Sequence, residues 1–277
     1  MNVNRFLSFA LSFVFVFVLS MSSVQMVAQS LPVSRHRHVV IAHRGDHVSL
    51  PENTLLAYKQ GIDDGADYVE VDLRTTRDSF LVVMHNETVD RMTNGRGAIR
   101  DFDYAAIRGL VIWDAVHNQA TRIPSFEEVL ALCRNKINIY LDFKEADPGV
   151  TYAMIKKAGM EKHVAVYANS LEQITEWGKV APAMPVITSI PDELKDSAAV
   201  AAFLDRYPIV GVDGSIGQYS PAIYRLFAQR HIAVWLDVQQ KDEGPATWEK
   251  ALAEKVPGMQ SDHPAALVAY LKQKGIR

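Results

Sequence analysis

Short apolar runs alternate with amphipathic segments along most of this sequence, and the alternation is its main fold signal. We predict strands at 39–42, 68–73, 137–143, 164–167, 186–190, 209–212, 232–238 and 258–261. Helical spacing of apolar positions follows them at 53–65, 125–134, 150–158, 171–180, 193–206, 220–230, 246–255 and 264–274. Eight strands that alternate with helices favour a closed parallel barrel over an open sheet.

One part of the chain departs from this alternation. The run 81–84 has the character of a hairpin partner for the second strand, and residues 86–122 are mostly polar with turn signals such as Asn94-Gly95. We predict an insertion of about 86–122 at the barrel mouth. The fold class is therefore α/β, a TIM-type (β/α)8 barrel over residues 36–277 with a small insertion after the second strand.

The N-terminal residues 1–28 have the pattern of a secretory signal peptide. Arg5 provides the positive charge, and residues 6–19 form an apolar segment that is short for a membrane span. We expect an exported, periplasmic or secreted protein of a bacterial envelope, with an uncleaved N-terminal anchor as the alternative. We expect no stable membrane span in the mature chain.

Composition narrows the function classes. A net charge of −3 gives no reason to expect nucleic-acid binding, and 48% apolar residues suit a globular core. The single cysteine, Cys133, excludes an internal disulfide or a cysteine metal cluster. Because Cys133 shares a helical face with apolar residues, we expect it to be a core residue.

Polar side chains recur at the carboxyl ends of the predicted strands, where barrel enzymes have their active sites. They are His43, Arg44, Glu70, Asp72, Asp142, Lys144, Asp213 and Asp262. Glu70 and Asp72 are two residues apart on a strand, so both point to one face and repel unless a cation or a proton lies between them. With Asp142 they could bind one divalent cation, Mg²⁺ or Ca²⁺.

A cation within a ring of donors suits a phosphoryl group, whose negative charge shifts as an ester bond breaks. His43, Arg44, His85 and Lys144 would provide such donors. Two histidines also fit an acid and a base on opposite sides of the phosphorus.

At these residues the sequence resembles the glycerophosphodiester phosphodiesterase family. The matching pieces are His43-Arg44-Gly45, Pro51-Glu52-Asn53-Thr54, Glu70-x-Asp72, His85, Arg91-x-Thr93-Asn94-Gly95-x-Gly97, Ile123-Pro124, Glu127-Glu128-Val129-Leu130, Asp142-x-Lys144, Trp235 and residues 258–264. The resemblance covers nearly all of the chain after residue 36. It implies a β/α barrel that hydrolyses phosphodiesters with one divalent metal.

The resemblance also implies roles for individual residues. Glu70, Asp72 and Asp142 would be metal ligands, with Glu52 as a possible supporting residue near the metal. His43 and His85 would be the general acid and base. Arg44 and Lys144 would bind phosphate, and Trp235 would form a substrate wall. The assignment of acid and base stays open, as does the choice between attack by water and attack by a substrate hydroxyl.

Two departures from the family pattern affect these expectations. Asp142 stands where the family usually has glutamate, and with Lys144 it resembles the related sphingomyelinase D/phospholipase D-type barrels. Trp235 is followed by Leu236-Asp237-Val238 in place of the usual Thr, Val and Asn. Outside the motifs, we expect Asp262 to cap the last helix and His117 to be solvated. Asp213 could equally be a polar residue of the barrel rim or a turn residue.

The favoured function is an exported, metal-dependent phosphodiesterase that converts small glycerophosphodiesters into glycerol 3-phosphate and an alcohol. An alternative is a phospholipase D-like enzyme acting on intact phospholipids, which predicts exposed apolar residues on the insertion, with 110–113 as one candidate. A metal-free phosphatidylinositol-specific phospholipase C would leave the three carboxylates unexplained. An inactive envelope binding protein conflicts with the complete set of histidines, cations and acids.

Overall fold

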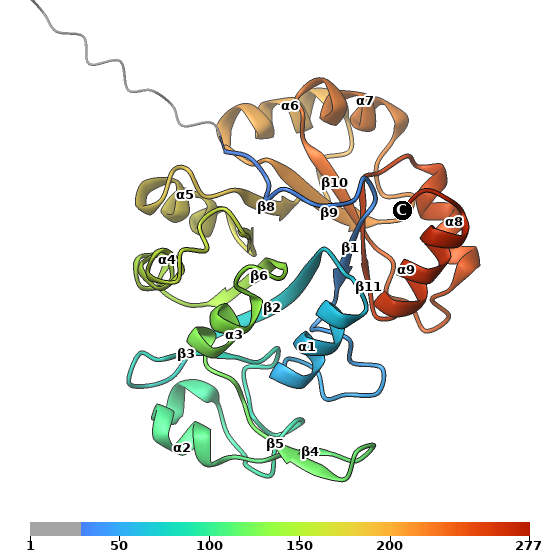
Figure 1. The fold of residues 1–277 in the computed structure, drawn as a ribbon. Helices are drawn as coiled ribbons and strands as arrows, with labels where there is room; N and C mark the ends of the chain where they lie inside the picture. The colour runs from blue at the N-terminus through green and yellow to red at the C-terminus, as the bar shows by residue number, and fades with distance from the viewer. Residues whose placement is uncertain (1–28) are drawn as a thin grey trace, which may run out of the picture.

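The computed structural model describes residues 29–277, whose centre is a closed ring of parallel strands surrounded by helices (Figure 1). The ring consists of β1 (Val39–Ala42), β2 (Tyr68–Thr75), β6 (Asn138–Glu145), β7 (Val164–Ala168), β8 (Val186–Ser189), β9 (Gly211–Ser215), β10 (Ala233–Asp237) and β11 (Gly258–Ser261). It closes where Ile41 and Ala42 of β1 pair with Tyr68 and Val69 of β2. The predicted (β/α)8 barrel is confirmed, whereas the predicted signal peptide lies outside the described residues.

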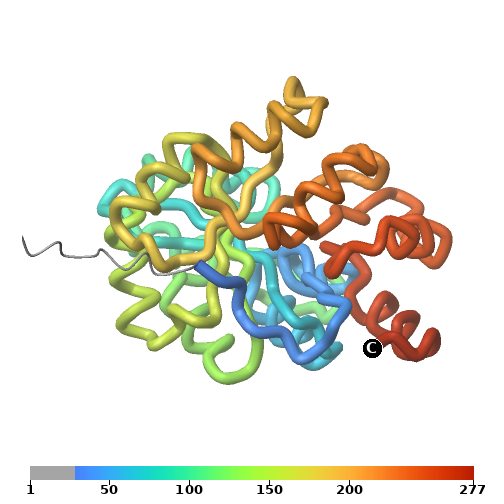
Figure 2. The backbone as a smooth tube through the Cα atoms, turned by 90° about the horizontal axis from the view of Figure 1, so that it is seen from above, coloured from blue at the N-terminus to red at the C-terminus, as the bar shows by residue number. Residues whose placement is uncertain are grey.

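Helices follow the barrel strands and lie around them on the outside, as the turned view in Figure 2 shows. They are α1 (Leu55–Asp63), α3 (Phe126–Cys133), α4 (Pro148–Lys157), α5 (Leu171–Val180), α6 (Ser197–Arg206), α7 (Pro221–Gln229), α8 (Pro245–Ala253) and α9 (Pro264–Gln273). The capping box predicted at Ser125 and Glu128 is present at the start of α3. Among residues 29–277, no helix has the length and apolar character needed to cross a membrane.

The stretch after β2 forms a small subdomain beside α1 and α3 (Figure 1). Strand β3 (Leu81–Val83) pairs antiparallel with β2, as predicted for the hairpin partner. The elements that follow were not predicted from the sequence. They are η1 (Ile99–Asp101), α2 (Tyr104–Gly109) and the hairpin of β4 (Ile112–Asp114) and β5 (Gln119–Thr121). They enclose an apolar cluster of Val82, Met84, Val89, Ile99, Ile107, Ile112 and Ile123.

The interior of the barrel holds an apolar layer below the polar side chains of the strand ends. Trp235 lies at its centre, with its ring 5.0 Å from that of Tyr68 and 5.9 Å from that of Tyr140. Ile41 and Ile187 pack in the same cluster. Because large side chains fill this layer, a small molecule could reach the polar groups only from the carboxyl ends of the strands.

Residues 29–38 close the opposite end of the barrel. Leu31 packs against the interior apolar cluster, and the hydroxyl of Tyr68 donates to the carbonyl of Pro32 at 2.7 Å. The carboxylate of Asp67 ties this segment down, because it accepts hydrogen bonds from Ser34 at 2.8 Å and from Arg277 at 2.6 Å. The two ends of the described chain therefore meet at this face.

Candidate active site

Three acidic side chains converge inside the carboxyl end of the barrel. Glu70 and Asp72 alternate inward along β2, and Asp142 stands beside Asp72 in the parallel register of β2 and β6. One oxygen of each carboxylate lies within 4.8 Å of an oxygen of the other two. The structure thus brings together all three residues that the resemblance implies as metal ligands.

Burial and neighbouring carboxylates raise the pKa values of Glu70 and Asp142. Burial, then the charges of Asp72 and Asp142, raise the pKa of Glu70 well above its ordinary value, against the opposing effect of Arg44. Burial and Asp72 also raise the pKa of Asp142, although Lys144 and Asn169 oppose this. Arg44 and Lys144 therefore do not fully offset the negative charge of the three acids.

The donor set fits a hard divalent cation. All three side chains offer carboxylate oxygens, the atoms that Mg²⁺ and Ca²⁺ prefer. The Oδ1 atom of Asp72 is buried without a hydrogen bond, and the Nζ atom of Lys144 lies 3.3 Å from it. A buried, unbonded acceptor between two other carboxylates is an arrangement that a bound cation would satisfy.

Two asparagine side chains fix the orientation of these acids. Asn53 donates from Nδ2 to Asp72 Oδ2 at 2.7 Å and accepts from the hydroxyl of Tyr58 at 2.6 Å. Asn169, just after β7, donates to Asp142 Oδ1 at 2.7 Å. Neither asparagine was predicted from the sequence to have a role. Asn169 follows a predicted strand, so its position at the rim was the available signal.

Arg44 and Lys144 bring positive charge to the acids. The backbone amide of Arg44 donates to Glu70 Oε2 at 2.7 Å, and its Nε atom lies 3.6 Å from Asp72 Oδ2. Lys144 forms ion pairs with Asp142 and Asp72. Although burial opposes it, the charges of Asp142 and Asp72 raise the pKa of Lys144, so this lysine is a cation at neutral pH.

The turn after β1 depends on glycine. Arg44 and Gly45 both have positive φ angles, 52° and 82°. A Cβ atom on Gly45 would lie 2.6 Å from the backbone carbon of Ala57, so no other residue fits against α1 here. This close approach holds His43 and Arg44 at the end of β1.

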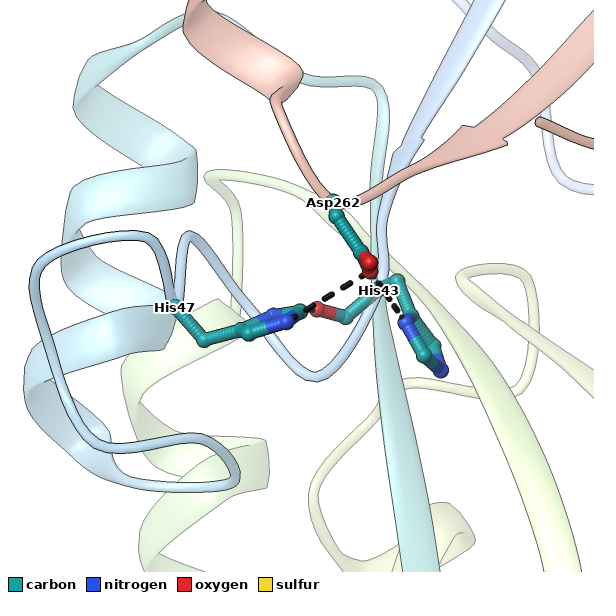
Figure 3. Close-up of side chains that lie close together, drawn as sticks. All are labelled: His43, His47 and Asp262. Carbon is teal, nitrogen blue, oxygen red and sulfur yellow. Dashed lines mark hydrogen bonds and ion pairs between the residues drawn. The ribbon is translucent and has the colours of Figure 1, made fainter. Parts of the chain in front are cut away.

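His43 makes contacts that the sequence analysis did not anticipate. Its Nδ1 atom lies 2.6 Å from Asp262 Oδ1, and His47 Nε2 lies 3.4 Å from the same oxygen (Figure 3). The prediction that Asp262 caps the last helix is wrong, since the N-cap of α9 is His263, without a side-chain hydrogen bond. A carboxylate that follows a strand can turn back toward the barrel, as it does here.

His85 follows β3 and is held through its backbone. The guanidinium of Arg74 donates to the His85 carbonyl from Nε at 3.0 Å and from Nη2 at 2.7 Å. Its ring Nδ1 lies 3.2 Å from Asn86 Oδ1. Arg74 continues the inward alternation of Glu70 and Asp72 along β2, and that spacing was the signal that could have identified it.

Glu52 binds Arg44 and Arg91, and among the hydrogen bonds of residues 29–277 it has none to the three acids. It accepts from Arg44 at 3.2 Å and from the Nη2 atom of Arg91 in the subdomain at 2.6 Å. Burial opposes ionisation, yet Arg91 and Arg44 lower the pKa of Glu52. Glu52 therefore links the subdomain to the turn after β1.

Trp235 is only 4% exposed and packs in the interior layer. The prediction that it forms a substrate wall finds no support in this placement, because little of the side chain is available for contact.

Cys133 is buried in the core, as expected. His117 is half exposed, with Nδ1 2.9 Å from Asp114 Oδ2.

Of the two interpretations left open for Asp213, the structure supports the rim residue and not the turn residue. Asp213 lies within β9 and accepts from the hydroxyl of Ser189 at 2.6 Å. Burial raises the pKa of Asp213 to about 6 and that of Asp237, on β10, to about 8. The barrel mouth thus carries two further carboxyl groups opposite β2.

Comparison with known proteins places this site in a family. The sequence profile of the glycerophosphoryl diester phosphodiesterase family matches residues 43–180, which include all three acids and both histidines. A glycerophosphodiester phosphodiesterase of Caldanaerobacter subterraneus is 34% identical over 53% of this chain and 65% of its own length. The chain thus spans slightly less than two thirds of that relative. A second, from Bacillus subtilis, is 29% identical over 68% of this chain and 71% of its own length.

Solved structures share the fold. A glycerophosphodiester phosphodiesterase from Agrobacterium tumefaciens superposes with a TM-score of 0.75 and 24% identity, covering 84% of this chain and 99% of its own. A phosphodiesterase from Oleispira antarctica was solved in complex with the product sn-glycerol-3-phosphate. It superposes with a TM-score of 0.73 and 19% identity, covering 84% of this chain and 96% of its own. The profile match and the relatives show that the chain belongs to the glycerophosphoryl diester phosphodiesterase family.

Proposed function

We propose that this protein hydrolyses glycerophosphodiesters to glycerol 3-phosphate and an alcohol, with one divalent cation held by Glu70, Asp72 and Asp142. The observation that carries the proposal is the convergence of these three buried carboxylates, within 4.8 Å, in a chain of this family. Product bound to the related Oleispira antarctica phosphodiesterase supports glycerol 3-phosphate as the product here.

The cation, when bound, would supply Lewis-acid stabilisation of the phosphoryl oxygens. The chain's own residues would bind the phosphate and transfer the protons. Arg44 and Lys144 lie beside the acids and can donate to the non-bridging oxygens of a phosphate. One of His43 and His85 would take the proton of the attacking water or substrate hydroxyl, and the other would give a proton to the leaving oxygen.

A panel of diesters tests the proposal. Glycerophosphocholine, glycerophosphoethanolamine and glycerophosphoglycerol are incubated with Mg²⁺, Ca²⁺ or Mn²⁺, and the products are identified by mass spectrometry. We expect glycerol 3-phosphate and the free alcohol, and no reaction after exhaustive chelation. His43→Ala and His85→Ala should each lower kcat by about 10²- to 10⁴-fold while circular dichroism shows a folded protein. Undiminished turnover in a chelated sample, or in either variant, would contradict the mechanism.

One observation favours a second candidate, action on intact phospholipids. On the hairpin of β4 and β5, Trp113 is 58% exposed and Val116 is 67% exposed, while Ile112 is buried. Exposed tryptophan and aliphatic side chains are typical of segments that enter a lipid interface. The same panel, extended by phosphatidylcholine vesicles, separates the two candidates, because only the second predicts release of choline from intact lipid.

We also propose that the protein is exported. Support comes from the sequence alone, namely Arg5 and the apolar segment 6–19, which lie outside the described residues. Fractionation of expressing cells and N-terminal sequencing of the protein provide the test. Recovery of unprocessed protein only from the cytoplasm would contradict export.

A further inference from the structure

Asp262 lies beyond the region 43–180 that matches the family profile, in the segment between β11 and α9. Its Oδ1 atom faces two imidazole rings, His43 Nδ1 at 2.6 Å and His47 Nε2 at 3.4 Å. Figure 3 shows the other ring nitrogen of His43 directed away from Asp262. Among the described residues, this contact is the one hydrogen bond that the His43 ring makes.

We propose that Asp262 is the positioning residue of His43, and that His47 competes for the same carboxylate oxygen. The inference rests on the proposed function, in which His43 transfers a proton. Asp262 accepts the Nδ1–H of His43, which fixes the ring and its tautomer and leaves Nε2 for the substrate.

Asp262 is itself held firmly. Glu243, before α8, accepts from the backbone amide of Asp262 at 2.9 Å, and its other oxygen accepts from Trp248 Nε1 at 2.9 Å and from the hydroxyl of Ser261. The backbone amide of His43 donates to the carbonyl of Ser261 at 3.1 Å. Both members of the His43–Asp262 contact are therefore fixed through β11.

The charges around Asp262 keep it ionised. Burial opposes this, but the hydrogen bond from His43 and the charges of His43, His47 and Arg44 lower the pKa of Asp262. Asp262 therefore stabilises an imidazolium at His43 without taking its proton. The arrangement serves either role, because Nε2 accepts a proton from a hydroxyl as a base and returns one to the leaving oxygen as an acid.

His47 can donate to Asp262 Oδ1 only when the His47 ring is protonated on both nitrogens. Its Nδ1 atom lies 2.7 Å from the carbonyl of His43, so Nδ1 carries a proton. A neutral His47 would then direct the lone pair of Nε2 at the carboxylate, whereas a protonated His47 directs an N–H. The other charged groups facing this pair are Arg44 and, toward His47, Glu52.

Kinetic pH profiles of three variants test the inference. In Asp262→Asn we expect kcat/KM to fall on the order of 10- to 100-fold, the range seen when a histidine of a metal site loses its carboxylate partner. The limb of the profile set by His43 should move to lower pH, because the imidazolium loses a stabilising charge. In His47→Gln the same limb should move to higher pH, because the competing cation is gone.

Asp114→Asn is the matched control. It removes another carboxylate that faces a histidine, His117 at 2.9 Å, on the hairpin of β4 and β5. Its pH profile should equal that of the native protein. Unchanged limbs in both Asp262→Asn and His47→Gln would overturn the inference.

Nitrogen NMR of labelled histidines separates this inference from the proposed function. We expect the neutral His43 ring to carry its proton on Nδ1 in the native protein and to lose that preference in Asp262→Asn, with His43→Gln identifying the signal. The same tautomer in both proteins would overturn the inference. If the tautomer responds but no diester is hydrolysed, the proposed function fails and the positioning role stands.

Discussion

Asp142 reaches less far from β6 than the glutamate usual at this position in the family would. Its carboxylate nevertheless meets those of Glu70 and Asp72, because Asn169 holds one oxygen and Lys144 pairs with the other. The shorter side chain is thus part of a local arrangement that includes Asn169 and Lys144. A longer side chain would have to displace these two contacts.

Substituting Asp142 by glutamate tests that arrangement. We expect Asp142→Glu to bind metal more weakly and to change the preference between Mg²⁺ and Ca²⁺, because the added methylene moves the carboxylate off Asn169. Isothermal titration with each cation measures both effects, and Asp142→Asn, which keeps the length but removes the charge, is the control. Identical affinities in the native and Asp142→Glu proteins would show that the ligand length does not matter.

Ionisation of Asp237 at the barrel mouth lowers the free energy of unfolding as the pH rises. Burial and the charge of Asp213 raise the pKa of Asp237 from 3.8 to about 8, so the folded protein binds this proton more tightly than the unfolded chain does. Stability contributed by the neutral form is therefore lost as the pH rises from about 4 to about 8. We expect Asp237→Asn to unfold at higher denaturant concentration than the native protein at pH 8.5.

Both proteins should be close in stability at pH 4, where Asp237 is protonated in the folded state. Urea titrations at the two pH values, in the absence of metal, measure the difference. If the two proteins differ equally in free energy of unfolding at both pH values, the ionisation of Asp237 is not the cause of the difference.

Element by element, the strand and helix pattern was predictable because a buried barrel strand must be apolar. The bounds of β1, β11 and α5 agree with the prediction to the residue. Helix α6 begins at Ser197 and not at 193, since Asp196 caps it through the amides of Ala198 and Ala199. Apolar spacing alone could not locate that cap.

The subdomain after β2 was not predictable in the same way. Its apolar cluster draws single residues, such as Val89, Ile107 and Ile123, from segments far apart in the sequence. No segment there carries a full helical or strand period. The contacts of Asp262 and Asn169 were hidden for a related reason, because only the closed barrel brings β11 beside β1 and β7 beside β6.

The capping box of α3 stabilises the helix that leads into β6. Ser125 accepts from the Glu128 amide at 3.2 Å, and Glu128 accepts from the Ser125 amide at 2.8 Å. We expect Ser125→Ala to lower the free energy of unfolding by about 1 kcal/mol, the usual cost of a lost N-cap. Urea denaturation measures it.

Ser197→Ala, at the first position of α6 without a capping bond, is the matched control. Its stability should lie within about 0.5 kcal/mol of the native value. A loss as large as that of Ser125→Ala would mean that the capping box is not the source of the effect.

For the whole molecule, metal binding and folding should be coupled. Because burial and the neighbouring acids raise the pKa of Glu70, protons compete with a cation for the three carboxylates. We expect chelation to lower Tm, and added cation to raise it more at pH 7.5 than at pH 5.5. A cation at a hundredfold excess over Kd would stabilise the fold by about 2.7 kcal/mol.

Differential scanning fluorimetry at the two pH values provides the measurement. Asp72→Asn removes the central carboxylate and should show no response to the cation at either pH. A Tm that rises equally in this variant would locate the cation elsewhere on the protein.

The closure of the barrel by residues 29–38 has a consequence for traffic through the molecule. Gln29 donates to the carbonyl of Pro182 at the end of the barrel opposite the three acids, and Leu31 seals that end against the interior. A cation, a diester and its products would therefore all share one entrance. A product that stays bound there would block the arrival of the next diester.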